Sequence, residues 1–242
     1  MTKNLFDNSN SVKNYYKLSR TKIELFIECP RCFYFDIKLG ITRPPGFPFT
    51  LNNAVDVLLK KEFDSHRFKN QQHPLMKQYK LDLLPYDHKQ IDEWRNRGIF
   101  YLDKRSNFLI YGKVDDVWVD RDNRLYIVDY KATSTSQEIS LEGGGYKDSY
   151  KREVEIYQWL FKKNNFNVSS TAYFVYVNAL KNKEYFDGKL EFDVKLLAYE
   201  GNDAWIENVL IDIFNVLSLS KPPLGNKDCD FCKYIDKLKI YL

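Results

Sequence analysis

Apolar and polar residues follow two different periods along this chain, and the two periods predict helices and strands in turn. Apolar residues recur at helical spacing in three segments, residues 51–66, 148–163 and 203–217. A further helix is expected from Arg20, which Ser19 can cap. Aromatic and β-branched runs predict strands at 99–102, 108–119, 125–132, 171–179 and 189–199. This order predicts a mixed α/β fold with a central sheet flanked by helices.

The two strands on either side of residues 121–123 are expected to form a hairpin, because Arg-Asp-Asn suits a tight turn. Strand alternation puts Asp129 and Lys131 on one face of the sheet. A three-residue turn sets Asp115 opposite Asp129, and a two-residue turn sets Asp116 there instead. In either register, two carboxylates and a lysine meet on one patch of the sheet.

Carboxylates are unusual inside strands, because they are depleted there and costly to bury without a partner. Here they stand within V-D-D-V and I-V-D-Y. A hard cation such as Mg²⁺ requires converging carboxylates, with water and substrate phosphate in its other positions. The lysine can neutralise developing phosphate charge or orient the attacking water. The alternative is a hairpin with solvated charges on its exposed face, but the apolar flanks favour the metal site.

Three short motifs occur in order on the predicted strand, strand and helix: G-K-V-D at 112–115, D-Y-K at 129–131 and E-V-E-I-Y at 153–157. This order resembles the PD-(D/E)XK nuclease superfamily and is most similar to its RecB-like and Cas4-like branch. That branch shows G-x-x-D, D-x-K and Q-x-x-x-Y, often with cysteines on both sides of the nuclease core. The resemblance covers about residues 19–235 and implies a restriction-endonuclease-like αβββαβ core.

The resemblance also implies a role for each residue of the hairpin. Asp115 and Asp129 are expected to hold Mg²⁺ or Mn²⁺, with the backbone carbonyl of Tyr130 as a further oxygen ligand. Lys131 is expected to stabilise the transition state or to orient the hydrolytic water. The chain is therefore expected to be a metal-dependent nuclease that hydrolyses phosphodiester bonds in DNA.

Two positions depart from the family pattern. Family members often carry a metal-binding histidine on the first core helix, where this chain has Asp56; a carboxylate also suits a hard cation. Otherwise Asp56 is a solvated partner of Lys60 at i+4. Glu153 replaces the family's glutamine and cannot donate to phosphate, which leaves it as a substrate contact or as a further metal-facing carboxylate. Tyr157, one turn later, is expected to pack in the core with its hydroxyl at the rim of the site.

The four cysteines form two C-x-x-C pairs, Cys29 with Cys32 and Cys229 with Cys232. In a cytoplasmic chain, such pairs indicate a four-thiolate metal site rather than disulfides. The N- and C-terminal segments are then expected to meet. The resemblance favours a 4Fe–4S cluster, but its cysteines are usually divided one and three, so structural Zn²⁺ and free thiols stay open.

Length and charge add few constraints. The 242 residues with a net charge of +4 suit a single domain over 19–235, with a helical or looped insertion at about 67–97, a frayed tail at 1–18 and a short tail at 236–242. No run of 18 apolar residues occurs, so we expect a soluble cytoplasmic protein without a membrane partner.

The expected partner is DNA, bound without sequence preference, and RecB-like nucleases commonly work beside helicases. Basic residues at the start of the helix after the hairpin either contact the DNA backbone or form a solvated helix start; they are Lys147, Lys151 and Arg152. Two other functions remain open: a nucleic-acid-binding module of the same fold that does not cleave, and a structural metalloprotein whose only site is the cysteines. The sequence does not decide between DNA and RNA or between single and double strands.

Overall fold

The structure is a computed structural model that describes residues 15–47, 50–239 and 241. The chain forms two compact units, each assembled from separate stretches of sequence. One unit contains Pro48–Ile99 and Gly112–Asp203, and the other contains Met1–Phe47, Phe100–Tyr111 and Ala204–Leu242. The single domain expected over residues 19–235 stays a prediction, because two compact units can still unfold together.

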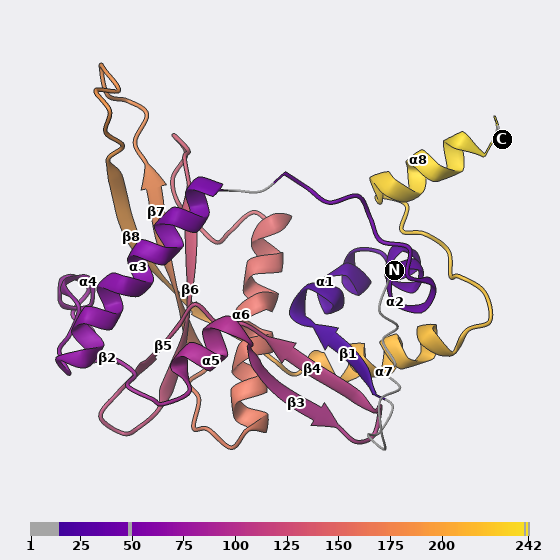
Figure 1. Cartoon of the computed structure of the whole chain (residues 1–242), viewed down its shortest axis with the longest axis horizontal. Helices are drawn as coiled ribbons and strands as arrows, with labels where there is room; N and C mark the ends of the chain where they lie inside the picture. Colours follow the sequence, from indigo (N-terminus) through magenta and orange to yellow (C-terminus); the bar gives the residue numbers. More distant parts are fainter. Residues whose placement is uncertain (1–14, 48–49, 240, 242) are drawn as a thin grey trace. The chain divides into compact units, whose positions relative to one another are not determined.

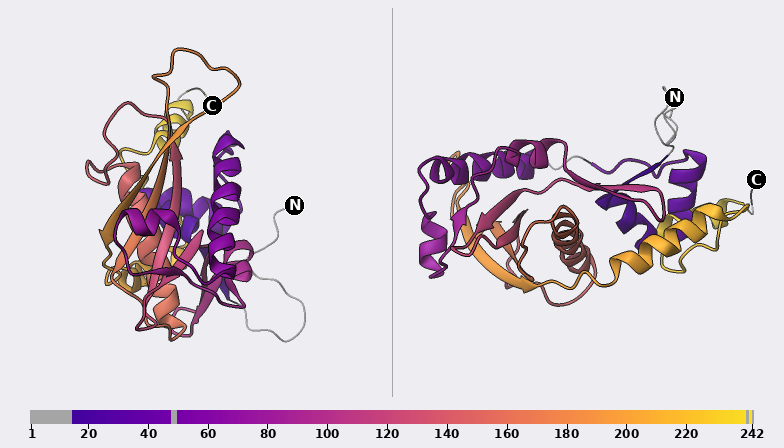
Figure 2. Two further views of the ribbon diagram at one scale, coloured as in Figure 1. Left: turned by 90° about the vertical axis from the view of Figure 1, so that its left-hand side faces the viewer. Right: turned by 90° about the horizontal axis from the view of Figure 1, so that it is seen from below.

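The unit that contains Gly112–Asp203 has a five-stranded mixed sheet with α3 (Thr50–Phe68) on one face and α6 (Tyr146–Lys163) on the other (Figures 1 and 2). Its strands in spatial order are β2 (Leu84–Pro85), β5 (Asp116–Val119), β6 (Leu125–Thr133), β7 (Thr171–Ala179) and β8 (Phe192–Glu200). β6 and β7 are parallel and are connected through α6, as a parallel pair requires, and the other neighbours are antiparallel. The predicted α/β fold is confirmed.

The β5–β6 hairpin has the register of a three-residue turn. Asp116 pairs with Val128, and the backbone N–H of Asp120 donates to the carbonyl of Arg124. Asn123 closes the turn at φ 57°, in the left-handed region that asparagine tolerates better than most residues. Of the two registers that the sequence leaves open, the three-residue turn is therefore the one that forms.

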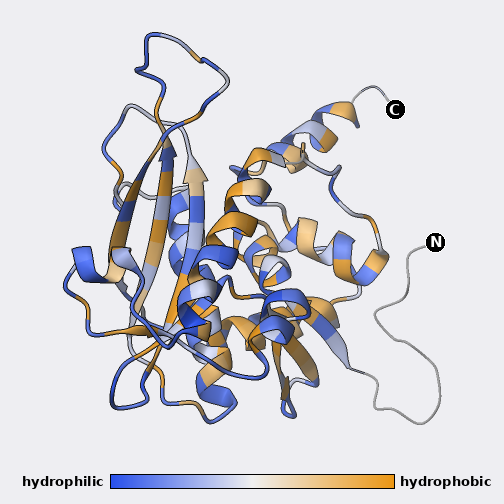
Figure 3. Cartoon of the chain, turned by 60° about the vertical axis from the view of Figure 1, so that its left-hand side comes forward, coloured by the Kyte–Doolittle hydropathy of each residue, from blue (hydrophilic) through white to orange (hydrophobic). Residues whose placement is uncertain are grey.

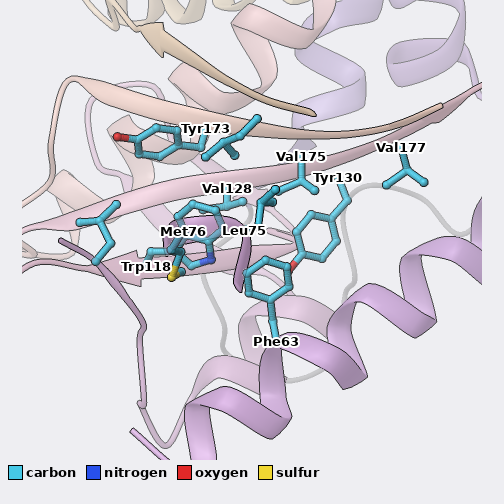
Figure 4. Packing of buried hydrophobic residues seen from close by; sticks show 11 residues of the cluster. Phe63, Leu75, Met76, Trp118, Val128, Tyr130, Tyr173, Val175 and Val177 are labelled. Atoms are coloured by element: carbon cyan, nitrogen blue, oxygen red, sulfur yellow. The ribbon is translucent and has the colours of Figure 1, made fainter. Parts of the chain in front are cut away.

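A hydrophobic cluster fills the space between α3 and the sheet (Figure 4). Phe63 of α3 stacks on Trp118 with ring centroids 5.4 Å apart and lies 5.7 Å from the ring of Tyr130. Phe63 and Trp118 are fully buried, and burying a side chain of this size stabilises the fold by about 2–3 kcal/mol. Tyr130 thus points towards α3, which directs Asp129 and Lys131 to the opposite face.

The segment 67–97 is more than the helical or looped insertion that the sequence predicts. It contains α4 (Pro74–Gln78) and α5 (Ile91–Asn96), and between them β2 extends the sheet by pairing with β5. A two-residue strand carries no periodic pattern, so the sequence could not reveal it.

The other unit contains a three-stranded sheet in the order β1 (Tyr16–Ser19), β4 (Phe108–Gly112) and β3 (Ile99–Asp103). The predicted strand over 108–119 is therefore wrong in its extent, since β4 and β5 belong to different sheets. The chain leaves the strand conformation over residues 113–115 between them. Apolar residues continue on both sides of this break, so their pattern gives no sign of it.

Four helices complete this unit: α1 (Arg20–Glu28), α2 (Pro30–Leu39), α7 (Ile206–Ser218) and α8 (Asp230–Leu238). The Ser19 hydroxyl caps α1 as predicted, accepting a hydrogen bond of 3.2 Å from the backbone N–H of Lys22. Residues 16–18, expected in a frayed tail, lie in β1, and residues 236–238 of the expected C-terminal tail lie in α8. The rest of the predicted N-terminal tail, residues 1–14, is outside the described residues.

Hydrophobic and hydrophilic residues are interspersed along both the strands and the helices (Figure 3). Within the described part of the chain, no helix combines the length and the apolar character that a membrane crossing requires.

Candidate metal and catalytic site

The two predicted metal-binding aspartates come from neighbouring strands. Asp129 lies in β6, and Asp115 directly precedes β5, whose first residue, Asp116, pairs with Val128 of β6. The Asp115 carboxylate accepts a hydrogen bond of 2.9 Å from the backbone N–H of Tyr130. This bond ties Asp115 to the neighbouring strand. The hairpin thus brings the two acids together on one patch of the sheet.

Neither aspartate has enough positive charge nearby to offset its burial. Burial raises the pKa of Asp129 well above its usual range; Lys131 lowers it, and Glu153 and Asp115 raise it further. Burial also raises the pKa of Asp115, against the lowering effects of Lys60 and of a backbone N–H. A raised carboxyl pKa means that the ionised form is disfavoured at that position. Added positive charge would therefore be bound favourably here.

Lys131 lies among acidic and aromatic partners. Its Nζ is 2.6 Å from Asp129 Oδ2, 3.0 Å from Glu153 Oε2 and 4.4 Å from the centre of the Tyr150 ring. Burial lowers the pKa of Lys131, but the charges of Asp129 and Glu153 outweigh burial and hold this pKa above its ordinary value. Lys131 is therefore a fixed ammonium group at neutral pH.

Glu153 and Tyr157 form one contact system with the glycine of the first motif. Glu153 Oε1 accepts a hydrogen bond of 3.0 Å from the Tyr157 hydroxyl, while Oε2 faces Lys131. The Tyr157 ring packs so closely on Gly112 that a Cβ at that position would lie 2.4 Å from a ring carbon. The glycine of G-K-V-D is therefore required by packing. Glu153 and Tyr157 are both buried, and their predicted contact with substrate stays a prediction.

Asp56 is connected to the site through Lys60. The Lys60 ammonium lies 2.8 Å from Asp56 and 3.2 Å from Asp115. The i+4 pair that the sequence offered as an alternative thus forms, but it does not make Asp56 remote from the site. The sequence analysis treated Lys60 only as a surface partner of Asp56, because helical spacing cannot reveal its contact with Asp115.

The charge and chemistry of these residues fit a divalent cation. The carboxylates belong to Asp56, Asp115, Asp129 and Glu153. The ammonium groups of Lys60 and Lys131 face these four carboxylates, and the formal charge of these six residues together is −2. Asp129 Oδ2 is buried and, within the described chain, accepts no hydrogen bond of ordinary geometry; its near neighbour is the Lys131 ammonium. Carboxylate oxygens are the donors that Mg²⁺ prefers, so the donor set fits.

The carboxylates are spread more widely than the ligands of a closed metal site. Among the residues that the structure describes, the only group of three or more histidine, cysteine or acidic residues whose ligand atoms all lie within 4.8 Å of one another is the four cysteines. Asp129 and Glu153 both contact Lys131, at 2.6 Å and 3.0 Å, and Asp115 and Asp129 stay the predicted ligands. Asp56 and the carbonyl of Tyr130 are further candidates.

Asp116 belongs to the opposite face of the sheet and is not part of this site. It is fully buried, and its Oδ1 accepts hydrogen bonds from Arg67 at 2.5 Å and from Arg95 at 3.0 Å. Its Oδ2 accepts from the Tyr130 hydroxyl at 3.0 Å and from Trp118 Nε1 at 3.3 Å. The sequence analysis missed both arginines, which lie 49 and 21 residues from Asp116.

A pocket of about 580 Å³ opens beside Lys131. Its walls come from the carboxyl ends of β6 and β7, the first turns of α3 and α6, and the loop after β6. Of the three basic residues expected to contact DNA, Lys147 lines this pocket and donates a hydrogen bond of 2.6 Å to the carbonyl of Glu142; Lys151 and Arg152 are outside its lining. Tyr150, which the sequence analysis did not single out, precedes Glu153 by one helical turn and lies on the same helix face.

The four cysteines form one buried cluster, as predicted. All four belong to the unit that contains Met1–Phe47 and Ala204–Leu242. Their sulfur atoms are 3.5 Å apart for Cys32 and Cys229, 3.6 Å for Cys29 and Cys232, and 3.7 Å for Cys32 and Cys232. Four thiolates on one tetrahedral Zn²⁺ with Zn–S bonds of about 2.3 Å would be about 3.8 Å apart. The cluster therefore has the chemistry and the spacing of a single-ion site.

The thiolate is the form that binds metal, and the cysteines of the cluster differ in how readily they form it. Burial raises the pKa of Cys32, and burial together with contacts to the other cysteines raises the pKa of Cys232. Burial raises the pKa of Cys29, but backbone N–H groups of Cys32 and Asn226 outweigh it, and the pKa falls to about 7. The Arg43 guanidinium donates to the Cys229 sulfur at 3.5 Å. Gly225 lies so close that a Cβ there would be 2.7 Å from the sulfur of Cys232.

Comparison with known proteins identifies the family. The sequence profile of the PD-(D/E)XK nuclease superfamily matches residues 48–236, more than three quarters of the chain. The chain therefore belongs to the PD-(D/E)XK nuclease superfamily. It is also similar to a solved structure described as "Crystal structure of SSO0001", with 14% identity and a TM-score of 0.45 over 99% of this chain and 93% of that chain. No curated protein matches the chain.

Proposed function

We propose that this protein is a metal-dependent nuclease of the RecB-like and Cas4-like branch that hydrolyses phosphodiester bonds in DNA. Membership of the PD-(D/E)XK superfamily supports nuclease chemistry in general. The observation that carries the proposal is the excess of negative charge beside Lys131, where burial raises the pKa of Asp115 and Asp129. A protein that had no use for a cation would not gain from two poorly compensated acids at one point.

In this proposal Asp115 and Asp129 hold the ion, with Asp56 and the Tyr130 carbonyl as further oxygen ligands. A bound Mg²⁺ or Mn²⁺ supplies Lewis-acid polarisation of the phosphate and a more acidic water. The protein's own contribution centres on Lys131. Because its pKa is raised, Lys131 acts as a cation and hydrogen-bond donor, not as a base. It stabilises the charge that develops on the phosphate or orients the attacking water.

Glu153 positions this lysine. Its carboxylate lies 3.0 Å from the Lys131 ammonium, and the Tyr157 hydroxyl holds its other oxygen. A glutamine in its place would hold the lysine without the negative charge. Glu153→Gln therefore tests whether the departure from the family pattern matters for cleavage.

The decisive experiment is an assay of end-labelled single-stranded DNA with Mg²⁺, Mn²⁺ or EDTA. We expect cleavage by the wild-type protein with either metal and a loss of at least about 1,000-fold in Asp129→Asn and in Lys131→Ala. Asp92→Asn removes an acid whose side chain is 84% exposed and serves as the matched control with unchanged cleavage.

Two results would contradict the nuclease proposal. Equal DNA binding by wild type and Asp129→Asn, with cleavage by neither, would favour a binding module. Absence of both DNA binding and calorimetric Mn²⁺ binding would leave the cysteine cluster as the only site. RNA and duplex DNA in the same assay define the substrate, and a helicase partner and a cytoplasmic location belong to the proposal as expectations.

We also propose that the cysteine cluster holds a single tetrahedral ion, with Zn²⁺ as the first candidate. Sulfur separations of 3.5–3.7 Å favour one shared ion over a 4Fe–4S cluster, in which each thiolate binds a different iron. Metal analysis of anaerobically purified protein should give one zinc per chain and a colourless solution. A broad blue-violet absorption band with iron would establish the cluster instead.

A further inference from the structure

The pocket beside Lys131 has a side-chain composition that the proposed cleavage chemistry does not explain. Three tyrosines line it: Tyr146 and Tyr150 from the first turns of α6, and Tyr176 from β7. Tyr176 is the register partner of Lys131 across the parallel β6–β7 pair, so both side chains emerge on the same face. The tyrosines that line the pocket therefore lie directly beside Lys131.

The three rings differ in exposure. Tyr150 lies under the Lys131 ammonium at 4.4 Å, and its ring is 5.4 Å from that of Tyr146 at an interplanar angle of 69°. Tyr146 is 65% exposed, whereas Tyr176 is buried to 6% exposure. The ring of Tyr146 is thus accessible for stacking, while the ring of Tyr150 already contacts the Lys131 ammonium. An exposed aromatic ring beside a cation is the arrangement that binds unpaired bases.

We propose that this pocket binds the nucleoside next to the cleaved phosphate, with its base stacked on Tyr146. The inference rests on the proposed function, since it takes Lys131 as the contact to that phosphate. A volume of about 580 Å³ is in the range of small-molecule sites and accommodates one nucleoside. A base inside a duplex has its faces covered by its neighbours, so only an unpaired nucleotide can enter. The substrate class is therefore a single strand or an unpaired end.

The polar groups of the pocket suit a base of any identity. Burial raises the pKa of Tyr176 to about 12, so its hydroxyl is a protonated donor at neutral pH. Thr133 and Gln137 in the lining can each donate or accept. Adaptable groups of this kind favour binding without sequence preference.

The experiment combines a protein change with a substrate change. The variants are Tyr146→Ala and the conservative Tyr146→Phe, and Tyr185→Ala is the matched control because Tyr185 is similarly exposed at 76% but does not line the pocket. Each is assayed on labelled single strands that are intact or carry one abasic residue at successive positions along the strand. Urea unfolding verifies that each variant is folded.

We expect the wild type to cleave about 10-fold more slowly at the bond next to the abasic residue, as loss of one base–aromatic stack implies. Tyr146→Ala should cleave the intact strand about 10-fold more slowly and show no added penalty for the abasic residue. Tyr146→Phe and Tyr185→Ala should behave as wild type. Equal abasic penalties in wild type and Tyr146→Ala would overturn the pocket proposal.

A second readout separates this proposal from the proposed function. A single strand that carries 2-aminopurine is titrated with each protein in EDTA, where no cleavage occurs. Quenching by the wild type that is lost in Tyr146→Ala supports the pocket even if cleavage is never observed. Unchanged quenching in that variant overturns the pocket even if cleavage is strong.

Discussion

Neighbouring carboxylates on the two faces of the sheet differ in how fully positive charge compensates them. On the face covered by α3, Asp116 is fully buried and meets two guanidinium groups, from Arg67 and Arg95. On the other face, Asp129 shares the Lys131 ammonium with Glu153, and Asp115, which precedes β5, shares the Lys60 ammonium of α3 with Asp56. Asp115 and Asp116 are adjacent in the sequence, yet Asp116 belongs to a fully paired ion network (the closed face) and Asp115 to one with too little positive charge (the open face).

This difference separates stability from function. A buried acid that is paired on all sides holds the fold together but is not free to bind anything else. A buried acid with too little positive charge costs stability, and a protein tolerates that cost where a ligand later supplies the charge. Asp116 is therefore a structural residue, and Asp115 and Asp129 are candidate ligands, although the motif alone does not distinguish them.

The largest expected effect comes from exchanging the acids on the two faces for their amides. Asp116→Asn removes the fully buried counter-ion that Arg67 and Arg95 share, leaves them only the partly exposed Asp64, and should lower the free energy of unfolding by about 3 kcal/mol. Asp129→Asn removes a disfavoured charge and should leave this free energy unchanged or higher. Urea unfolding in EDTA measures both. Equal losses in the two variants would show that the faces do not differ.

A bound divalent ion should compensate the charge of Asp115 and Asp129 and so stabilise the open face. Mn²⁺ at 100 times its dissociation constant should raise the free energy of unfolding of the wild-type protein by about 2.7 kcal/mol. Asp115→Ala and Asp129→Ala should lose this increment, and Asp92→Asn should keep it. Thermal unfolding with and without Mn²⁺ tests this, and an unaltered response in Asp129→Ala would place the ion elsewhere.

Removing one hydroxyl group, that of Tyr130, should weaken the ion network of the closed face. Tyr130→Phe removes the hydroxyl that donates to Asp116 and keeps the ring beside Phe63. Because a hydrogen bond to a buried charge is lost, the free energy of unfolding should fall by about 2 kcal/mol. Tyr126→Phe, which loses a bond to the partly exposed Asp120, is the control and should fall by less. A larger loss in Tyr126→Phe would contradict the assignment.

The open face should also give a pH signature. The pKa of Asp129 is raised in the folded protein, so between the unfolded value near 3.8 and the folded value the native state binds more protons. The stability contribution of Asp129 is therefore lost as pH rises through this window, at about 1.4 kcal/mol for each unit by which the pKa is raised. In EDTA, wild type should lose stability relative to Asp129→Asn as the pH rises above the unfolded value near 3.8. A constant difference between the two would contradict the raised pKa.

Much of the candidate site could be predicted from sequence because the chemistry is local. The turn chemistry of residues 121–123 correctly offers the three-residue-turn register, in which Asp116 pairs with Val128. Strand alternation then places Asp129 and Lys131 together, and helical spacing joins Glu153 to Tyr157. Each of these relations depends on residues within one hairpin or one helix.

What the sequence could not provide comes from contacts between distant segments. Arg95 reaches Asp116 from a segment that carries no periodic pattern, and Lys60 reaches Asp115 across 55 residues. The break between β4 and β5 was hidden because apolar residues continue on both sides of it. Tertiary contacts between distant segments determine these ion pairs and this strand break, and a single sequence does not reveal such contacts.

The discontinuous assembly of the unit with the cysteines has a consequence for biosynthesis. Cys29 and Cys232 are 203 residues apart, and the unit also needs residues 100–111 from the middle of the chain. A nascent chain on the ribosome cannot complete this unit until residues 204–242 have emerged, and these follow every residue of the other unit. Translation would therefore deliver the carboxylate site first and join the two cysteine pairs last.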